Sequence, residues 1–280
     1  MTVLLLSCPD RPGLVAKVAE FVHLFGGNIV DADQHSDLTH QRFLQRVEFD
    51  LPDSADAEAF EAGFSELAAT LDMEWRLHER ADRARIVILV SQQGHCLADL
   101  LGRSAMGGLD GSVIAVVSNH DTHADLTARF DVLFVHLPID PGDRGSQHAD
   151  LERTLDELSP DLVVMARYMQ ILPTAIIERY RDRIINIHHS FLPAFIGARP
   201  YHQAHERGVK LIGATAHYAT ADLDQGPIIC QDVQAVSHRD DVARLIARGR
   251  DLEMAVLARA VQLHLEHRVL AYANRTVVFD

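Results

Sequence analysis

Apolar positions follow two different spacings in the first eighty residues. The segment from Val3 to Cys8 is almost continuously apolar, which is typical of a buried strand. From Leu14 to Phe25 apolar side chains recur every three or four positions, which predicts an amphipathic helix. The same patterns predict strands at 29–35 and 42–49, a helix at 55–71 and a strand at 73–77. The order strand, helix, strand, strand, helix, strand predicts a ferredoxin-like domain.

The rest of the chain carries short apolar runs separated by segments long enough for helices. Runs that are apolar at every position indicate strands covered on both faces, so their alternation with helices predicts a doubly wound, mostly parallel sheet. These runs lie at 86–90, 113–117, 132–135, 162–165 and 184–187. Two further strands, at 211–218 and 228–236, flank a turn, and a long helix begins at Asp240 or Asp241. The fold class is therefore α/β.

A domain boundary is expected between these two patterns. The stretch from His78 to Arg85 is almost devoid of large apolar side chains, as linkers between compact domains are. We place the first domain at 1–82 and the second at 83–280.

The charge and the cysteine content limit which partners and which cellular compartment are expected for the protein. The 280 residues carry 26 basic and 40 acidic side chains, a net charge of −14, which argues against a nucleic-acid partner. No stretch reaches about 18 apolar residues and the apolar start lacks a basic segment, so we expect neither a membrane span nor a signal peptide. Cys8, Cys96 and Cys230 are too scattered for a disulfide framework. Reduced thiols and a cytoplasmic location are expected.

The densest polar cluster runs from Asn186 to Ser190, directly after an apolar strand. In open α/β sheets ligands bind beyond the carboxyl ends of strands, and alternation makes Asn186 and His188 point the same way. An amide and an imidazole that converge on one carbonyl suit acyl chemistry, although a loop of solvated histidines fits the segment about as well. Asp224 lies in a second polar cluster, where it either completes a turn or acts as a general base.

Metal and nucleotide cofactors find little support in the sequence. The chain has 17 histidines, so about one pair with the H-x-x-H spacing is expected by chance, and each of the three such pairs is weak evidence for zinc. No G-x-G-x-x-G follows the first strand of the second domain, so a nicotinamide or flavin is not expected. We expect no metal and no cofactor.

Three segments together resemble the catalytic core of the folate-dependent formyltransferases: NIHHSFLP from residue 186, GATAHY from 213 and DLDQGPII from 222. The resemblance extends over 85–280. It implies that Asn186, His188 and Asp224 surround the formyl group, and that 164–172 form the loop that holds the pterin. The substrate-binding residues so implied are Met165, Arg167, Tyr168, Met169, Ile171 and Leu172. His217 either lies beside Asp224 or is a packing histidine, and His95 is expected to line a small polar pocket.

The N-terminal half, with CPDRPGLV from residue 8 and GGNIV from 26, resembles an ACT domain. An ACT domain joined to a formyltransferase core, with HCL at 95–97, is similar to the deformylase branch of the family. That branch implies hydrolysis of 10-formyltetrahydrofolate, as substrate rather than cofactor, to tetrahydrofolate and formate. The loop at 91–97 also departs from the small-residue phosphate loop of members that use a phosphorylated acceptor.

Three alternatives remain open at this point. The first is a formyltransferase that uses an amine acceptor, the second is an inactive amino-acid sensor, and the third is a zinc hydrolase. The ACT resemblance implies a homo-oligomer and an amino-acid effector, bound where glycines allow close backbone approach and the next helix begins. The residues expected there are Asp10, Arg11, Gly13, Gly27 and Asn28. The alternative is that the first domain is a dimerisation module whose ligand site is empty.

Overall fold

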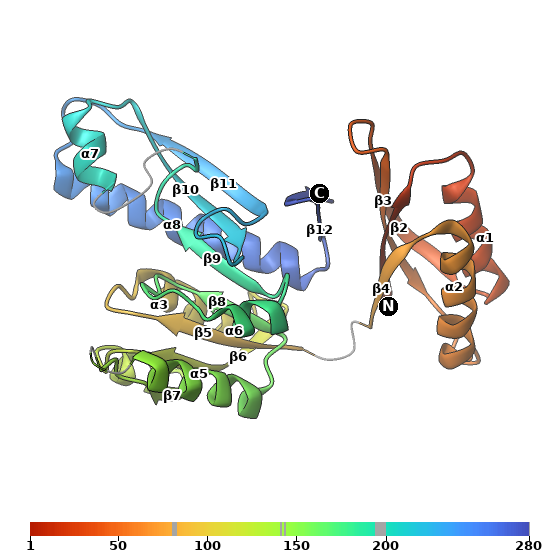
Figure 1. Ribbon diagram of the computed structural model, residues 1–280, viewed down its shortest axis with the longest axis horizontal. Helices are drawn as coiled ribbons and strands as arrows, with labels where there is room; N and C mark the ends of the chain where they lie inside the picture. Colours follow the sequence, from red (N-terminus) through yellow and green to blue (C-terminus); the bar gives the residue numbers. More distant parts are fainter. Residues whose placement is uncertain (80–82, 141, 143, 194–199, 280) are drawn as a thin grey trace. The chain divides into compact units, whose positions relative to one another are not determined.

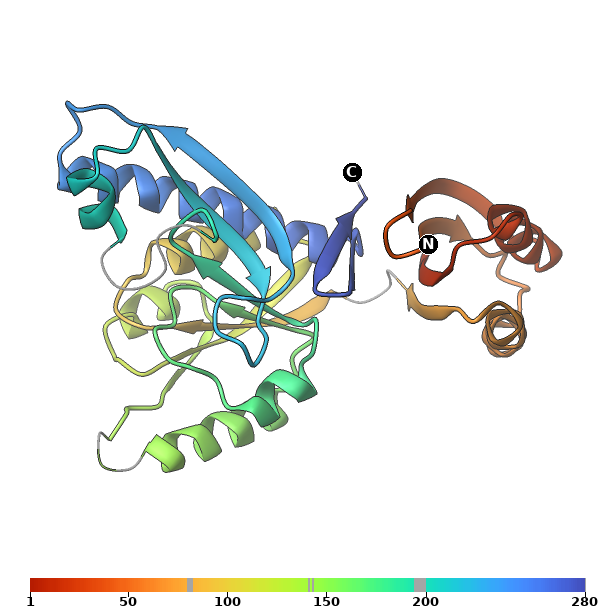
Figure 2. The ribbon, with the colours of Figure 1, turned by 45° about the horizontal axis from the view of Figure 1, so that its top comes forward.

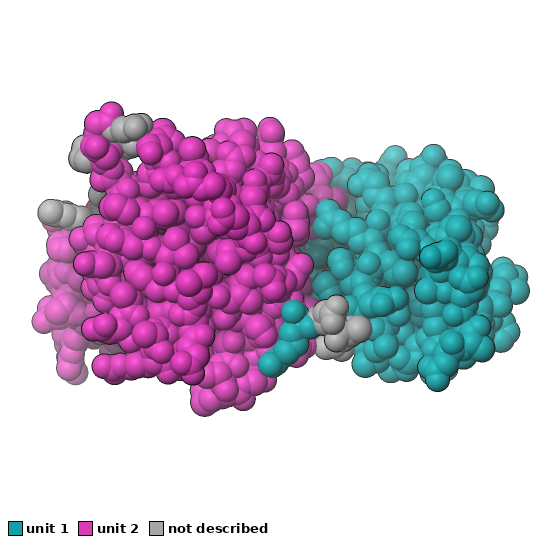
Figure 3. Space-filling model, turned by 90° about the horizontal axis from the view of Figure 1, so that it is seen from below, with its two compact units in different colours: residues 1–83, 267–270, 277–280 teal, residues 84–266, 271–276 magenta. Residues whose placement is uncertain are grey.

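The computed structural model describes residues 1–79, 83–140, 142, 144–193 and 200–279. The chain divides into two compact units, which Figure 3 colours separately. Unit 1 comprises Met1–Arg83 with His267–Leu270 and Val277–Asp280, and unit 2 comprises Ala84–Glu266 with Ala271–Thr276. The break at Arg83 falls beside the expected boundary at residue 82, but two short C-terminal segments group with unit 1 rather than with the second domain.

Unit 1 has the predicted ferredoxin-like order of elements (Figure 1). The elements are β1 (Thr2–Pro9), α1 (Leu14–Leu24), β2 (Asn28–Asp37), β3 (Arg42–Asp50), α2 (Ala57–Leu71) and β4 (Glu74–Glu79). The strands pair antiparallel in the order β2-β3-β1-β4. The apolar stripes of α1 and α2 bury Val18, Val22, Phe60 and Phe64 in one core with the sheet.

Unit 2 is built on a sheet with strand order β11-β10-β9-β8-β5-β6-β7. Its parallel part consists of β5 (Ala84–Val90), β6 (Gly111–Ser118), β7 (Leu133–His136), β8 (Leu162–Met165) and β9 (Ile184–His188). β10 (Leu211–Tyr218) and β11 (Ile228–Ala235) continue it antiparallel. The predicted mostly parallel α/β fold is confirmed.

Helices cover both faces of this sheet (Figure 2). They are α3 (His95–Ala105), α4 (Ala124–Ala128), α5 (Arg144–Leu158), α6 (Thr174–Arg179), α7 (Pro200–Glu206) and α8 (Val242–Leu265). Residues of α5 and α6 share a core with Val87 and Leu89, which alternate along β5 and so face the same side. α3 and α8 pack together on the other face. The long helix begins as predicted, because the Asp241 carboxylate caps it by accepting from the Arg244 N–H.

A hairpin of β12 (Val269–Tyr272) and β13 (Arg275–Val278) lies near the C-terminus, where the sequence pattern predicted no strands. Among the described residues, no helix is both long enough and apolar enough to cross a membrane.

Candidate active site

The parallel part of the sheet places two of the expected catalytic residues at the carboxyl end of β9. Asn186 and His188 are two positions apart on this strand and therefore extend to the same side. On the neighbouring strand β10, His217 is the register partner of Asn186. The sheet therefore brings together residues that are about thirty positions apart in the sequence.

Asp224 reaches this group from the loop between β10 and β11. Its backbone is left-handed, with φ 57°, a conformation that aspartate adopts more readily than most residues. Two positions later a Cβ at Gly226 would collide with the carbonyl oxygen of Tyr218, so only glycine allows the loop to fold back this closely. The left-handed backbone of Asp224 and the missing side chain of Gly226 therefore allow the loop to direct the Asp224 carboxylate toward β9.

His188 and Asp224 form a close pair. The Nδ1 of His188 lies 3.1 Å from Oδ1 of Asp224. The hydrogen bond from His188 holds the pKa of Asp224 below its ordinary value, although partial burial opposes this shift. His188 is 6% exposed, and its Nε2 has no hydrogen-bond partner within the described part of the chain. The pair thus presents an imidazole whose outer nitrogen is available for a substrate atom.

Asn186 is oriented by His217. The Nδ1 of His217 donates to the carbonyl oxygen of Tyr218 over 2.9 Å, which leaves Nε2 as an acceptor in the neutral ring. Asn186 Nδ2 donates to this Nε2 over 3.2 Å. Burial lowers the pKa of His217, which favours the same neutral ring. His217 therefore lies beside Asp224, with 3.9 Å between its Nε2 and Oδ1, and contacts a catalytic candidate directly.

A cavity of about 610 Å³ opens in front of these groups, lined by Asn186, His188 and Asp224. A smaller adjoining cavity is lined by His217 and Leu172. Of the other residues expected to bind substrate, the larger cavity is lined by Met165, Arg167, Tyr168, Met169 and Ile171. Its size is in the range of small-molecule sites.

The loop that follows β8 is fixed by Ser91, at the end of β5. The Ser91 N–H donates to the Arg167 carbonyl oxygen over 3.3 Å, and the Met169 N–H donates to the Ser91 hydroxyl over 3.0 Å. Tyr168 is buried, and its hydroxyl accepts from Gln147 over 3.0 Å. Two of the loop's backbone groups therefore set its shape, while its Met169 and Ile171 side chains are exposed beside the cavity.

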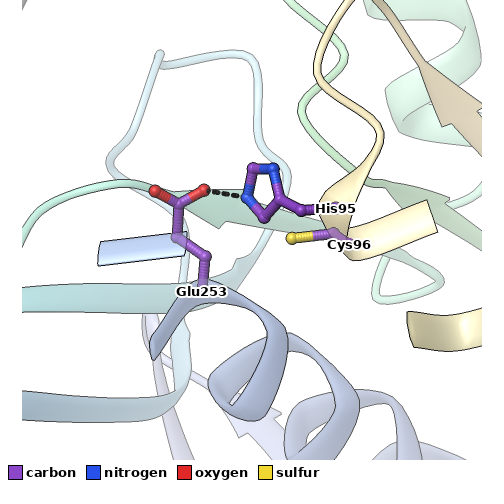
Figure 4. A group of neighbouring side chains, drawn as sticks. All are labelled: His95, Cys96 and Glu253. Atoms are coloured by element: carbon purple, nitrogen blue, oxygen red, sulfur yellow. Dashed lines mark hydrogen bonds and ion pairs between the residues drawn. The ribbon is translucent and has the colours of Figure 1, made fainter. Parts of the chain in front are cut away.

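His95, which was expected to line a small polar pocket, belongs to a charged cluster around Glu253. Its Nε2 donates to Oε2 of Glu253 over 2.8 Å (Figure 4). Glu253 is one of the residues that line the larger cavity, and His95 is not. The Tyr201 hydroxyl donates to the other carboxylate oxygen over 2.7 Å, and Arg167 Nε lies 3.5 Å from Oε2. Sequence reasoning missed Glu253, because one glutamate in a long helix gives no signal of its own.

This cluster also contains the one group of side chains in the described chain that has the composition of a metal site. Ligand atoms of His95, Cys96 and Glu253 lie within 4.8 Å of one another. Burial strongly raises the pKa of the Cys96 thiol, which disfavours the thiolate that a metal needs. The Arg167 guanidinium already provides a positive charge beside Glu253. The donor set therefore fits an internal ion-pair cluster better than a metal.

In unit 1, the residues expected to bind an effector are largely engaged in local structure. Arg11 Nη2 donates to the Leu71 carbonyl oxygen over 2.8 Å and pairs with Asp72. Gly13 is left-handed, with φ 90°, immediately before α1. A Cβ at Gly27 would lie 2.7 Å from the Val22 side chain, so this glycine allows the chain to pack against α1. The two other expected residues, at positions 10 and 28, are exposed.

Known proteins resemble both units. A family model described as formyl transferase matches residues 84–261, and an ACT domain model matches 2–62. A formyltetrahydrofolate deformylase of Synechocystis is 50% identical over 277 residues, which cover 99% of this chain and 97% of that protein. The chain belongs to the formyltetrahydrofolate deformylase family. The corresponding protein of Bacillus subtilis is 43% identical and covers 99% of this chain and 93% of its own.

Solved structures agree with this membership. The crystal structure of a formyltetrahydrofolate deformylase from Pseudomonas syringae pv. tomato covers 100% of this chain and 94% of its own, with a TM-score of 0.96 and 46% identity. Glycinamide ribonucleotide transformylase 1 from Symbiobacterium toebii covers 73% of this chain and 97% of its own, with a TM-score of 0.67 and 32% identity. The predicted membership in the deformylase branch is confirmed.

Proposed function

We propose that this chain hydrolyses 10-formyltetrahydrofolate to tetrahydrofolate and formate, with Asn186, His188 and Asp224 as its catalytic residues. One observation carries the assignment of residues: an amide, an imidazole and a carboxylate from two separate segments line one cavity, with the imidazole and the carboxylate 3.1 Å apart. Deformylase relatives that align with almost the whole chain support the reaction. The reaction would supply formate and adjust the pool of one-carbon folates.

The arrangement suits the addition of water to a formyl carbon. The Nδ2 of Asn186 has a second N–H besides the one used by His217, and this N–H donates to the formyl oxygen as it becomes an oxyanion. With Nδ1 of a protonated His188 donating to Asp224, its Nε2–H is a second donor to the same oxygen. The two donors thus stabilise charge that develops only in the transition state.

The remaining oxygen of Asp224 is placed to handle the water. Oδ1 accepts from His188, so Oδ2 accepts a proton from the attacking water as its oxygen bonds to the formyl carbon. The bond between that carbon and N10 then breaks as N10 takes the proton that Asp224 received from water, and the released formic acid loses its own proton to solvent. The products are formate and tetrahydrofolate, and no metal or cofactor is required for these steps.

Direct measurement tests this proposal. Purified protein is incubated with 10-formyltetrahydrofolate, with water as the only acceptor, and formate and tetrahydrofolate are measured. Asp224→Asn removes the proton-accepting carboxylate, while Asp222→Asn makes the same change at an exposed position of the same loop. We expect formate from the wild type and from Asp222→Asn, and almost none from Asp224→Asn. Formate production that survives in Asp224→Asn contradicts the assigned role, and a wild type that forms no formate contradicts the function.

We further propose that unit 1 binds a small amino acid near the turn from Asp10 to Gly13 and near Gly27-Asn28. The ACT family match supports this, and the N-terminus of α1 directly after Gly13 favours a carboxylate. A calorimetric screen of the common amino acids, with formate release measured in parallel, is the test. If no amino acid binds or changes the rate, unit 1 has no such effector.

Assembly and location follow as related proposals. β2 and β4 are the two edge strands of the unit 1 sheet, and an edge strand can pair with a second copy of the chain, so we expect a homo-oligomer. Light scattering that gives the mass of a single chain would exclude it. Cys8, Cys96 and Cys230 form no disulfide in the described part of the chain, in keeping with a reducing cytoplasm.

A further inference from the structure

Glu253 is a buried carboxylate, and carboxylates are rarely buried in proteins without a specific role. It is 1% exposed, lies in the middle of α8 and lines the same cavity as Asn186 and His188. Burial alone would raise the pKa of Glu253, but the hydrogen bonds from His95 and Tyr201 and the charge of Arg167 outweigh burial and keep it below the ordinary value. A negatively charged carboxylate, ion-paired with Arg167 over 3.5 Å, is therefore held at the wall of the cavity.

The position of this charge in the fold is informative. His95 and Cys96 are the first two residues of α3, and Figure 4 shows Glu253 reaching across from α8 to the start of that helix. A helix N-terminus attracts anions through its exposed N–H groups and its dipole. The first turn of α3 has no acidic residue of its own, and the preceding Gly94 provides no side-chain cap. The carboxylate that meets the start of α3 thus comes from another helix.

The surroundings hold Glu253 in this position from several sides. Tyr201 donates to one carboxylate oxygen and His95 to the other. The contact with Tyr201 depends on Gly249, one turn earlier on α8, because a Cβ there would collide with the tyrosine hydroxyl. Arg167 comes from the loop after β8 and is 8% exposed. Four segments of the chain thus combine to keep one carboxylate at the edge of the cavity.

We propose that Glu253 is a specificity-determining residue that acts as a built-in anion at the start of α3, so that the cavity rejects phosphorylated amine acceptors and leaves water to receive the formyl group. This inference rests on the proposed function, because water receives the formyl group only if the protein is a hydrolase. A transferase that acts on a ribonucleotide must bind a phosphate close to its catalytic groups. Glycinamide ribonucleotide transformylase 1 from Symbiobacterium toebii shares the fold of the second unit and acts, by its name, on such an acceptor. Here a resident carboxylate repels a phosphate from that end of the sheet.

Inorganic phosphate is the probe, and its binding is measured without folate by calorimetry and by the thermal unfolding midpoint. Wild-type protein is expected to show no binding and no shift at millimolar phosphate. Glu253→Gln keeps the shape and removes the charge, so we expect it to bind phosphate about tenfold more tightly or better, with a rising midpoint. The matched control is Asp251→Asn, an exposed position on the same helix, which should behave as wild type.

A second variant distinguishes the effect of the Glu253 charge from the effect of side-chain bulk at the start of α3. His95→Ala removes an imidazole beside the carboxylate but leaves Glu253 charged, so it should remain indifferent to phosphate. A His95→Ala protein that binds phosphate as tightly as Glu253→Gln would mean that bulk, not charge, excludes the anion, and would overturn the proposal. A folded Glu253→Gln protein that ignores phosphate would do the same.

The wild-type arm decides the proposal even where Glu253→Gln fails to fold. Phosphate that binds wild-type protein at millimolar concentration and raises its unfolding midpoint would show that the cavity still accepts an external anion, and would overturn the assignment. No binding to the wild type supports it. Formate release is assayed separately, so a wild type that releases no formate refutes the proposed function and leaves the phosphate result standing.

Discussion

The hydrogen bond between Asn186 and His217 gives a prediction whose size follows from the geometry. Asn186 Nδ2 donates to His217 Nε2 over 3.2 Å, and the Tyr218 carbonyl fixes the histidine tautomer. Asn186→Ala removes the proposed oxyanion donor itself. His217→Phe keeps a ring at this position but removes the acceptor that orients the amide. The two substitutions thus act on the same interaction with the formyl oxygen, one directly and one through its neighbour.

The expected magnitudes differ. Loss of one oxyanion donor costs about 2.7–4 kcal/mol, so Asn186→Ala should lower kcat by roughly 10²- to 10³-fold. A neutral hydrogen bond contributes about 0.5–1.5 kcal/mol, so His217→Phe should lower kcat by roughly 2- to 13-fold. In the double variant the amide is already gone, and removal of its support has nothing left to affect. We therefore expect the double variant to be no slower than Asn186→Ala alone.

Formate release at saturating 10-formyltetrahydrofolate is the assay, with KM measured alongside. Because His217 is 2% exposed, thermal unfolding must confirm that each variant is folded. KM should change little, since the contact with the formyl oxygen strengthens in the transition state. If the two substitutions multiply in the double variant, His217 does not act through Asn186. If Asn186→Ala retains a near-normal rate, the oxyanion role is wrong.

Further predictions follow from the same site. Asp224→Asn and His188→Ala should each nearly abolish formate release, with a double variant little worse than either, because groups that act as one unit are not additive; multiplying losses would contradict this. Burial, with the charges of Arg167 and His188, lowers the pKa of His189 to about 4, so the free energy of unfolding should fall as the pH drops from about 6.5 toward 4. His189→Phe should flatten that fall in denaturant titrations at several pH values. Gly226→Ala should displace Asp224 and abolish turnover, and an active, folded variant would show that the loop tolerates a side chain. Labelled water should place its oxygen in formate, and added glycinamide ribonucleotide should remain unformylated.

Much of the fold could be predicted because its signals are local. The apolar runs of unit 2 mark its parallel strands, and the predicted run at 132–135 differs from β7 by one residue at each end. The C-terminal hairpin was missed because β12 and β13 are short strands of mostly half-buried residues without a clear alternation. Short strands of this kind depend on tertiary contacts rather than on their own pattern.

The site was only partly predictable, and the difference has a physical basis. Asn186 and His188 could be placed because a strand fixes their common direction, and the family resemblance supplied Asp224. The neutral ring of His217 depends on the backbone carbonyl of Tyr218. The position of Glu253 beside the start of α3 depends on the packing of α8 against α3. Such relations arise only when segments distant in the sequence meet.

The choice of acceptor also depends on contacts between segments that are distant in the sequence. In their proposed roles, Asn186, His188 and Asp224 would activate a formyl group in the same way whether water or an amine attacks it, so these residues do not distinguish a hydrolase from a transferase. The distinction has to come from what else the cavity admits, and that depends on the charge and shape of its walls. Here the cavity that Asn186, His188 and Asp224 line is also lined by the buried carboxylate of Glu253, which accepts a hydrogen bond from His95. If Glu253 has its proposed role, the specificity of this site depends on an interaction between α8 and α3 and not on the three proposed catalytic residues.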